Sequence, residues 1–81
     1  MALHIIANAY WEPLDFELPA PDPSVSDGAA WRRVLDTTLP SPDDIRFGEE
    51  APAVETPSYR VGPRSVVVLA AEPAVPEEAY P

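Results

Sequence analysis

Apolar and polar residues alternate strictly along LDFEL (residues 14–18), so that three apolar side chains share one face. This period of two is typical of a strand that is buried on one side. The preceding segment, LHIIANAY (residues 3–10), is apolar on both alternating sets, which indicates a strand buried on both sides or one that awaits a neighbour. Because only WEP (residues 11–13) separates the two segments, the pattern predicts a β-hairpin.

Three later segments also predict strands. AWRRVLDT (residues 30–37) has β-branched and aromatic residues between turn signals, which favour a strand over a helix. SYRV (residues 58–61) is extended in character. RSVVVLAA (residues 64–71) is the strongest strand signal, because its consecutive β-branched and aliphatic residues indicate a central strand covered on both sides.

The intervening segments are rich in proline and acidic residues. PAPDPSVSDG (residues 19–28) predicts an exposed loop. SPDD (residues 41–44) predicts a helix start, with serine as N-cap, proline at the first position and acids in the first turn. Gly48 limits that helix to one or two turns, and EEAPAVETP (residues 49–57) predicts an acidic linker or flexible loop.

Composition supports one small all-β domain. Large apolar residues occupy 25 of 81 positions, which is enough for a single thin core, and 12 prolines argue against long helices. No cysteine is present, so no disulfide can stabilise the core. We expect a domain of four to six strands over residues 1–71 and a disordered tail, rich in proline and glutamate, over residues 72–81.

The charge balance excludes two classes of partner. Fourteen acids against five arginines give a formal net charge of -9, which argues against nucleic acids and anionic membranes. No run approaches the roughly 20 apolar residues of a membrane span, and the N-terminus lacks the pattern of a secretory signal. We therefore expect a cytoplasmic protein. Four arginines are interpreted as offsetting nearby acids, with one crossing an interface as an ion pair: Arg32, Arg33, Arg60 and Arg64.

Catalytic and metal-binding patterns are weak. The single histidine, His4, lies in an apolar strand, and the chain has neither cysteine nor a G-x-S-x-G nucleophile motif. Asp43 and Asp44 could form a carboxylate pair, but acids at a helix N-terminus explain them better. We therefore predict no catalytic residue, no metal and no cofactor.

Three aromatic residues are candidates for carbohydrate contact, since sugar rings stack on exposed aromatic faces. Tyr10 and Trp11 lie at the tip of the predicted hairpin, and Trp31 opens the third strand. Two adjacent aromatics in one turn cannot both point inward, so at least one should be exposed or docked on another surface. Packing in a core or at a domain interface is the preferred alternative.

Three segments together carry a family resemblance: LHIIANAYWEPLDFELP (residues 3–19), WRRVLDTTLPSPDDI (residues 31–45) and YRVGPRSVVVL (residues 59–69). In the first segment, Asn-Ala, an aromatic pair and Glu-Pro precede an alternating strand. The second segment begins with Trp and its strand ends in Asp-Thr. The third segment carries Arg-Ser-Val-Val-Val-Leu. In this order they resemble the C-terminal β-domain of isoamylase-type glycogen debranching enzymes, in the α-amylase superfamily (glycoside hydrolase family 13).

The resemblance implies a small antiparallel Greek-key β-sandwich. It also implies that hydrolysis of α-1,6 linkages in glycogen-like glucans belongs to a preceding (β/α) barrel, which needs about 250 residues. The two carboxylates of such a glycosidase lie on that barrel and match no position of this chain. The resemblance therefore implies a non-catalytic accessory domain that braces a catalytic barrel in cis or in trans.

Two other functions remain open. One is a free-standing carbohydrate-binding module that contacts an α-glucan through Tyr10, Trp11 and Trp31. The other is a protein-interaction module that pairs through an exposed strand edge with a separate catalytic chain or with a second copy of itself.

Overall fold

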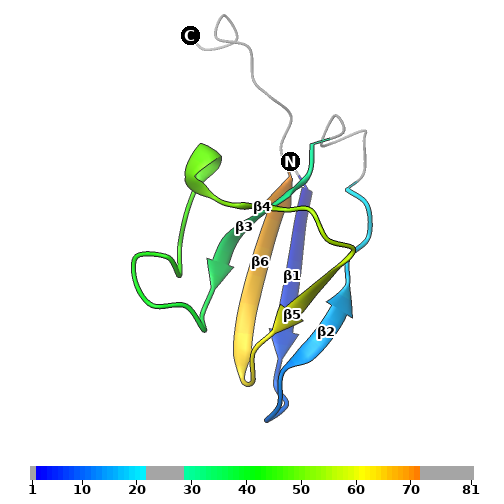
Figure 1. Cartoon of the computed structure of the whole chain (residues 1–81), viewed down its shortest axis with the longest axis vertical. Coiled ribbons are helices and arrows are strands. Elements are labelled where there is room, and N and C mark those ends of the chain that lie inside the picture. Colours follow the sequence, from blue (N-terminus) through cyan, green and yellow to red (C-terminus); the bar gives the residue numbers. More distant parts are fainter. Residues whose placement is uncertain (1, 22–28, 72–81) are drawn as a thin grey trace, which may run out of the picture.

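The computed structural model describes residues 2–21 and 29–71, which form six strands and one short helix (Figure 1). The predicted all-β class is confirmed. The predicted tail over residues 72–81 and most of the predicted loop over residues 19–28 lie outside the described residues. The elements are β1 (Ala2–Asn8), β2 (Leu14–Glu17), β3 (Trp31–Asp36), a 3₁₀ helix (Gly48–Glu50), β4 (Ala53–Val54), β5 (Ser58–Val61) and β6 (Ser65–Ala71).

The strands form two antiparallel sheets. The larger sheet has the order β1-β6-β3-β4, and the smaller one pairs β2 with β5. In Figure 1 β5 crosses in front of the larger sheet, with β2 beside it. The central position predicted for residues 64–71 is confirmed, because β6 lies between β1 and β3. The cover predicted on both of its sides is found on one side only, since Val66 and Val68 on the other side are only half-buried.

The predicted hairpin between residues 3–10 and 14–18 is wrong. β1 pairs with β6, whereas β2 pairs with β5 in the other sheet. The connection over residues 9–13 therefore carries the chain from one sheet to the other. A strand that is apolar on both sides gains more from pairing with the equally apolar β6 than from pairing with β2, whose alternate residues are acidic.

The predicted helix start at residues 41–44 is also wrong. These residues form turns with a cis Ser41–Pro42 peptide, and the chain then runs beside β3. The Asp36 amide donates to the Asp44 carbonyl oxygen at 2.9 Å, and the Arg46 amide donates to the Val34 carbonyl oxygen at 2.9 Å. The backbone N–H and C=O groups that would form hydrogen bonds within a helix therefore form them with β3 instead.

The predicted acidic linker over residues 49–57 contains ordered elements. It holds most of the 3₁₀ helix and the two-residue strand β4, which pairs with the beginning of β3. β3 contains a β-bulge between Arg33 and Leu35. The beginning of β3, before the bulge, pairs with β4, and the end of β3 lies beside residues 44–46. Among the described residues, no helix has the length and apolar character needed to cross a membrane.

A single thin core fills the space between the two sheets. Val61 from β5 and Val67 and Leu69 from β6 are fully buried. The core also contains Ile6, Trp31 and Ala71, and Phe16, Leu18 and Tyr59 pack against it. Alternation explains this arrangement, because every second residue of β1 and β6 points toward the smaller sheet.

The turn from β5 to β6 depends on close backbone packing. A Cβ atom at Gly62 would lie 2.5 Å from the Thr38 side chain, so only glycine fits there without movement. Arg64, two residues later, adopts a left-handed conformation with a φ of 48°. Its amide donates to the Tyr10 carbonyl oxygen at 3.0 Å and ties this turn to the connection between β1 and β2.

Candidate functional site

The four-stranded sheet has one covered face and one uncovered face. Ile6 on β1 points to the core and is 5% exposed, whereas its neighbour Ile5 points to the other side and is 65% exposed. On β6, Leu69 is fully buried and Val68 is only half-buried. The smaller sheet covers the first set of side chains. Among residues 2–21 and 29–71 no second sheet packs on the other set, although Ala70 on that side is only 7% exposed.

A row of aliphatic side chains crosses the uncovered face. Ile5 on β1 lies opposite Val68 on β6, and Val68 also lies opposite Leu35 on β3. Leu35 in turn forms an isolated bridge with Ile45, in the segment beside β3. These four residues, which we call the outer row, lie side by side across β1, β6, β3 and the segment beside β3.

The surroundings of the outer row are also apolar. The pair Leu3 and Ala70 lies on one side of it, and the pair Ala7 and Val66 lies on the other. Leu3, Ile5 and Ile45 are large apolar residues with exposed side chains. A charged group enters only at the rim, where Arg32 lies opposite Ala70 and donates to the Ala51 carbonyl oxygen at 2.8 Å. Contiguous exposed apolar surface with a polar rim is typical of a protein interface.

The covered face carries buried polar groups instead. Asp36, at the end of β3, is buried and accepts hydrogen bonds from the Thr38 amide at 3.0 Å, the Thr38 hydroxyl at 2.6 Å and the Tyr59 hydroxyl at 2.6 Å. Because Tyr59 belongs to β5, the last bond joins the two sheets.

The same contacts change two pKa values. Burial alone would raise the pKa of Asp36, but the hydrogen bonds from Thr38 and Tyr59, with the nearby Arg33 charge, together hold it below its ordinary value of 3.8. Burial and the hydrogen bond to Asp36 raise the pKa of Tyr59 above its ordinary value of 10.0. Asp36, Thr38 and Tyr59 are therefore held together by hydrogen bonds that favour the ionised carboxylate of Asp36.

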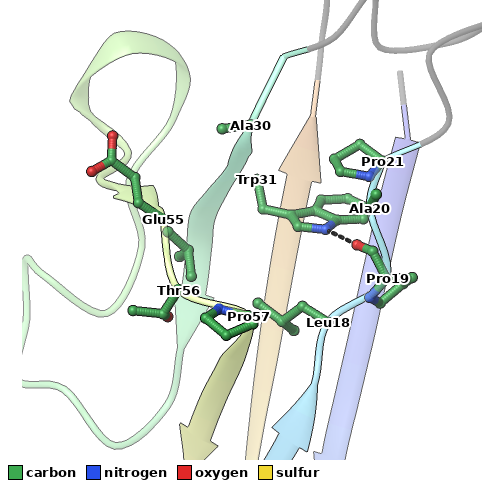
Figure 2. Close-up of a pocket in the computed structure, with 10 residues that line it drawn as sticks. Leu18, Pro19, Ala20, Pro21, Ala30, Trp31, Glu55, Thr56 and Pro57 are labelled. Carbon is green, nitrogen blue, oxygen red and sulfur yellow. Dashed lines mark hydrogen bonds between the residues drawn. The ribbon is translucent and has the colours of Figure 1, made fainter.

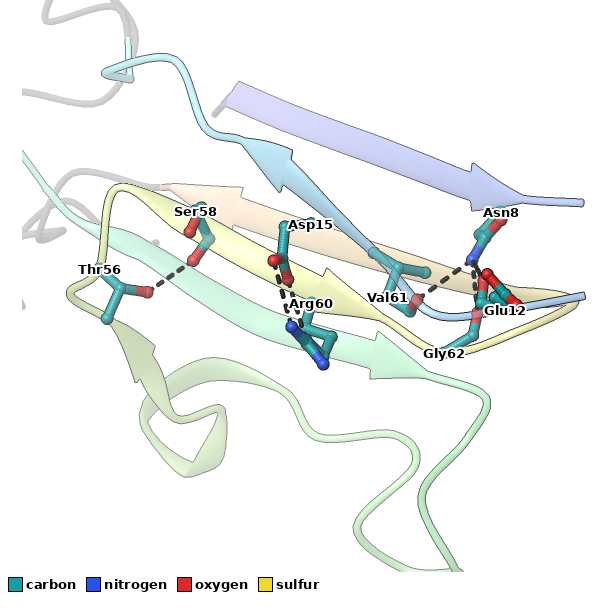
Figure 3. A network of polar contacts seen from close by, with 8 residues as sticks. All are labelled: Asn8, Glu12, Asp15, Thr56, Ser58, Arg60, Val61 and Gly62. Carbon is teal, nitrogen blue, oxygen red and sulfur yellow. Dashed lines mark hydrogen bonds and ion pairs between the residues drawn. The ribbon is translucent and has the colours of Figure 1, made fainter. Parts of the chain in front are cut away.

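A second polar group, Asn8 at the end of β1, also joins the sheets (Figure 3). Asn8 lies near the same end of the covered face as Asp36, because it is opposite Ser65 on β6 and Asp36 is opposite Val67. Its amide nitrogen lies 2.9 Å from the Glu12 carbonyl oxygen, 3.1 Å from that of Val61 and 3.0 Å from that of Gly62. Its side-chain oxygen accepts the Tyr10 amide at 2.9 Å. Asn8 thus holds the connection between the sheets in one conformation. Figure 3 also shows Arg60 and Asp15, which form an exposed ion pair at 3.0 Å across β5 and β2.

The structure brings together two of the three aromatic residues proposed to contact carbohydrate. Tyr10 and Trp11 lie in the connection between β1 and β2, with 49% and 67% of their surfaces exposed. Their ring centroids are 5.9 Å apart with an interplanar angle of 79°, an edge-to-face pair.

Trp31 lies at the opposite end of the sheet. It is 7% exposed, and its indole N–H donates to the Pro19 carbonyl oxygen at 2.7 Å. Figure 2 shows its ring beside an open hollow of about 630 Å³, lined by residues 18–21, 30–31 and 54–57. Trp31 therefore packs in the core, and it cannot share a ligand-binding surface with Tyr10 and Trp11.

The other residues considered for chemistry lie apart from one another. The His4 ring packs 5.7 Å from that of Trp31, and Asp43 forms an ion pair with Arg46 at 3.0 Å. Within residues 2–21 and 29–71, no group of three or more histidine or acidic side chains could hold a metal ion.

The sequence alone did not predict the outer row. It also did not predict the two polar residues that connect the sheets, Asn8 and Asp36, which we call the polar joints. The row depends on strand pairing between distant segments, which no local pattern reveals. Asn8 and Asp36 did leave a signal, because each is a polar residue at the end of a strand and directly follows apolar residues.

Comparisons with known proteins identify the family. The family model described as "Isoamylase, C-terminal" matches residues 1–70 of the chain. No curated protein and no solved structure matched the chain. The six antiparallel strands and the near-complete family match lead to one conclusion: the chain belongs to the family of isoamylase C-terminal domains.

Proposed function

We propose that the chain is a non-catalytic accessory domain of a glycogen debranching enzyme of the α-1,6-glucosidase type, in glycoside hydrolase family 13. We further propose that the outer row packs against the catalytic (β/α) barrel, in cis or in trans, and braces it. The observation that carries this proposal is the uncovered apolar row across four neighbouring segments of one sheet. The family match supports the pairing with a catalytic domain.

Burial of this row would stabilise a contact between domains. Complete burial of an exposed isoleucine side chain contributes roughly 1.5–3 kcal/mol, and both ends of the row, Ile5 and Ile45, are exposed isoleucines. Part of this gain offsets the loss of rotational and translational freedom, which is smaller when both domains belong to one chain.

The test uses the catalytic domain of an isoamylase-type enzyme, produced without its own C-terminal domain. We expect the 81-residue chain to bind it and to raise its melting temperature, and the chain alone to release no sugar from α-1,6-branched glucan. The double variant Ile5→Glu/Ile45→Glu should weaken binding at least tenfold, because it places two charges in the contact.

Leu14→Glu is the matched control, because Leu14 is exposed on the other sheet. It should bind as the unmodified chain does. The proposal fails if the unmodified chain does not bind the catalytic domain, if the double variant binds equally well, or if the chain alone cleaves α-1,6 linkages.

A second candidate function is that of a free-standing carbohydrate-binding module. The observation that favours it is the exposed pair Tyr10 and Trp11, because large aromatic rings with about half or more of their surface exposed are available to a ligand. Cytoplasmic residence and self-association stay predictions from the sequence; ultracentrifugation of the unmodified chain tests the second.

A further inference from the structure

We propose that Tyr10, Trp11 and Arg64 form a binding site for the sugar rings of an α-glucan. The choice of α-glucan as the ligand rests on the proposed function. The site itself rests on three independent features, namely the exposed aromatic pair, its rigid support and a strained arginine beside it.

The rings of the aromatic pair, Tyr10 and Trp11, lie at a steep angle to each other and are both exposed to solvent. The two rings are nearly perpendicular at 79°, so one ring can offer its face while the other offers its edge. The flat C–H face of a pyranose ring stacks on such a surface, because stacking removes apolar surface of both the sugar and the aromatic ring from water. Both residues lie in the connection that follows β1, beyond the end of the strand that carries Ile5 of the outer row.

The support is rigid because Asn8 binds the backbone on both sides of the pair. The Asn8 side chain accepts the Tyr10 amide at 2.9 Å and donates to the Glu12 carbonyl oxygen at 2.9 Å. Arg64 adds a third tie, since its amide donates to the Tyr10 carbonyl oxygen at 3.0 Å. A site held in its binding conformation loses less conformational freedom when the ligand arrives.

Arg64 occupies a backbone conformation that favours glycine. Its φ of 48° is unfavourable for any residue with a Cβ, and stability alone would select glycine here. Strain of this kind concentrates at functional sites. The exposed arginine forms no ion pair with any described residue, and its guanidinium has five N–H donors that suit paired sugar hydroxyls.

The charge of the chain favours a neutral ligand over a phosphorylated one. A formal net charge of -9 repels polyanions, and Glu12 lies in the same turn as the aromatic pair. A neutral glucan avoids this repulsion, and its hydroxyls can both donate to a carboxylate and accept from a guanidinium.

The experiment is a titration of the full 81-residue chain, labelled with ¹⁵N, with maltoheptaose. The chain has two indole N–H groups, one on exposed Trp11 and one on buried Trp31. We expect the Trp11 signal to shift saturably, with a dissociation constant on the order of 1 mM, while the Trp31 signal stays in place. Sorbitol at the same mass concentration should shift neither signal.

Three variants locate the site. Trp11→Ala should abolish saturable shifts of the amides around Tyr10. Arg64→Gly should raise the dissociation constant at least fivefold without lowering the melting temperature, a combination that a purely structural arginine would not produce. The control Phe47→Ala, which removes another exposed aromatic ring, should leave the affinity unchanged.

The inference is overturned if maltoheptaose causes no saturable shift, if sorbitol causes the same shift, or if Phe47→Ala weakens binding as Trp11→Ala does. It is also overturned if Arg64→Gly binds with unchanged affinity. None of these outcomes affects the contact with the catalytic domain, which is tested with Ile5 and Ile45. The two proposals can therefore fail separately.

Discussion

The two faces of the four-stranded sheet are built from the same strands but have different roles. Ile5 and Ile6 are adjacent and chemically identical, yet one is 65% exposed and the other 5% exposed. The inner face is closed by the smaller sheet, whereas no second sheet of the described residues packs on the outer face. An apolar strand therefore need not be covered on both sides within its own domain, and the uncovered side is where we expect a partner.

The faces also differ in their polar content. The inner face ends in two buried polar joints, Asn8 and Asp36, which connect the sheets through hydrogen bonds of defined geometry. The outer row has no such groups. Buried polar groups are costly unless their partners are correctly placed, so they favour one arrangement of the two sheets. A row of aliphatic side chains has no hydrogen bonds whose geometry must be met, so it suits contact with another domain.

The largest expected difference between the faces is in how far a smaller side chain lowers the free energy of unfolding. Leu69→Ala on the inner face should lower the free energy of unfolding by about 2–5 kcal/mol, because it leaves a cavity in the core between the two sheets. Val68→Ala on the outer face should cost clearly less. Urea denaturation monitored by tryptophan fluorescence measures both. Equal losses for the two variants would contradict the contrast between the faces.

The next effect concerns the joint at Asn8. Asn8→Asp preserves shape but replaces the amide donor with an oxygen that faces the carbonyl oxygens of Glu12, Val61 and Gly62. We expect a loss of about 1–3 kcal/mol at pH 7, since these acceptors lose their donor. Glu12→Gln, which changes an exposed carboxylate nearby, should leave the free energy of unfolding within about 0.5 kcal/mol. A stability of Asn8→Asp equal to that of the unmodified chain would show that the joint is unnecessary.

A smaller effect is expected at the joint between Asp36 and Tyr59. The folded state lowers the pKa of Asp36, so its contribution to stability is complete above the ordinary value of 3.8 and is lost as the pH falls through the lower folded value. Tyr59→Phe removes one hydrogen bond to this carboxylate and should cost about 1.5 kcal/mol at pH 7. The loss should shrink as the pH falls below 3.8 and through the lower folded value, because a growing fraction of Asp36 is then protonated.

Urea denaturation of both proteins at pH 7 and pH 2 measures this dependence. If the cost of Tyr59→Phe is the same at the two pH values, the ionised form of Asp36 does not account for the bond. Tyr10→Phe, which alters an exposed hydroxyl away from this joint, is the matched control and should show no dependence on pH in this range.

The smallest effect on stability is expected for the outer row. Ile5→Thr keeps a β-branched residue on β1, so the free energy of unfolding of the isolated chain should change by no more than about 0.5 kcal/mol. Binding to the catalytic domain should nevertheless weaken, because a hydroxyl replaces apolar contact surface. A large loss of stability would mean that the side chain already packs within this domain.

Local patterns predicted the strands well. The segments that became β3, β5 and β6 were identified from their β-branched residues and flanking turn signals, which act within a few positions. The pairing of β1 with β2 was wrong because closeness in sequence does not decide which strand is the better partner. The helix at residues 41–44 was wrong because Asp44 and Arg46 bond to β3, a contact that no capping signal can reveal.

The candidate sites were predicted only in part. Tyr10 and Trp11 were identified from their composition and position, and the structure leaves both exposed. Trp31 was grouped with them, but the structure places it in the core at the opposite end of the sheet. The role proposed for Arg64 rests on its backbone conformation and on its hydrogen bond to the Tyr10 carbonyl oxygen, and the order of residues predicts neither.

The sequence by itself determined the all-β class, most strand positions, the central place of β6 and the family, since these depend on short-range alternation and on local motifs. Only the tertiary structure decided which face of the larger sheet is covered and which residues align into the outer row. The physical reason is that alternation assigns neighbouring side chains to opposite faces without stating which face will meet another layer. That choice depends on pairing between segments as distant as β1 and β6.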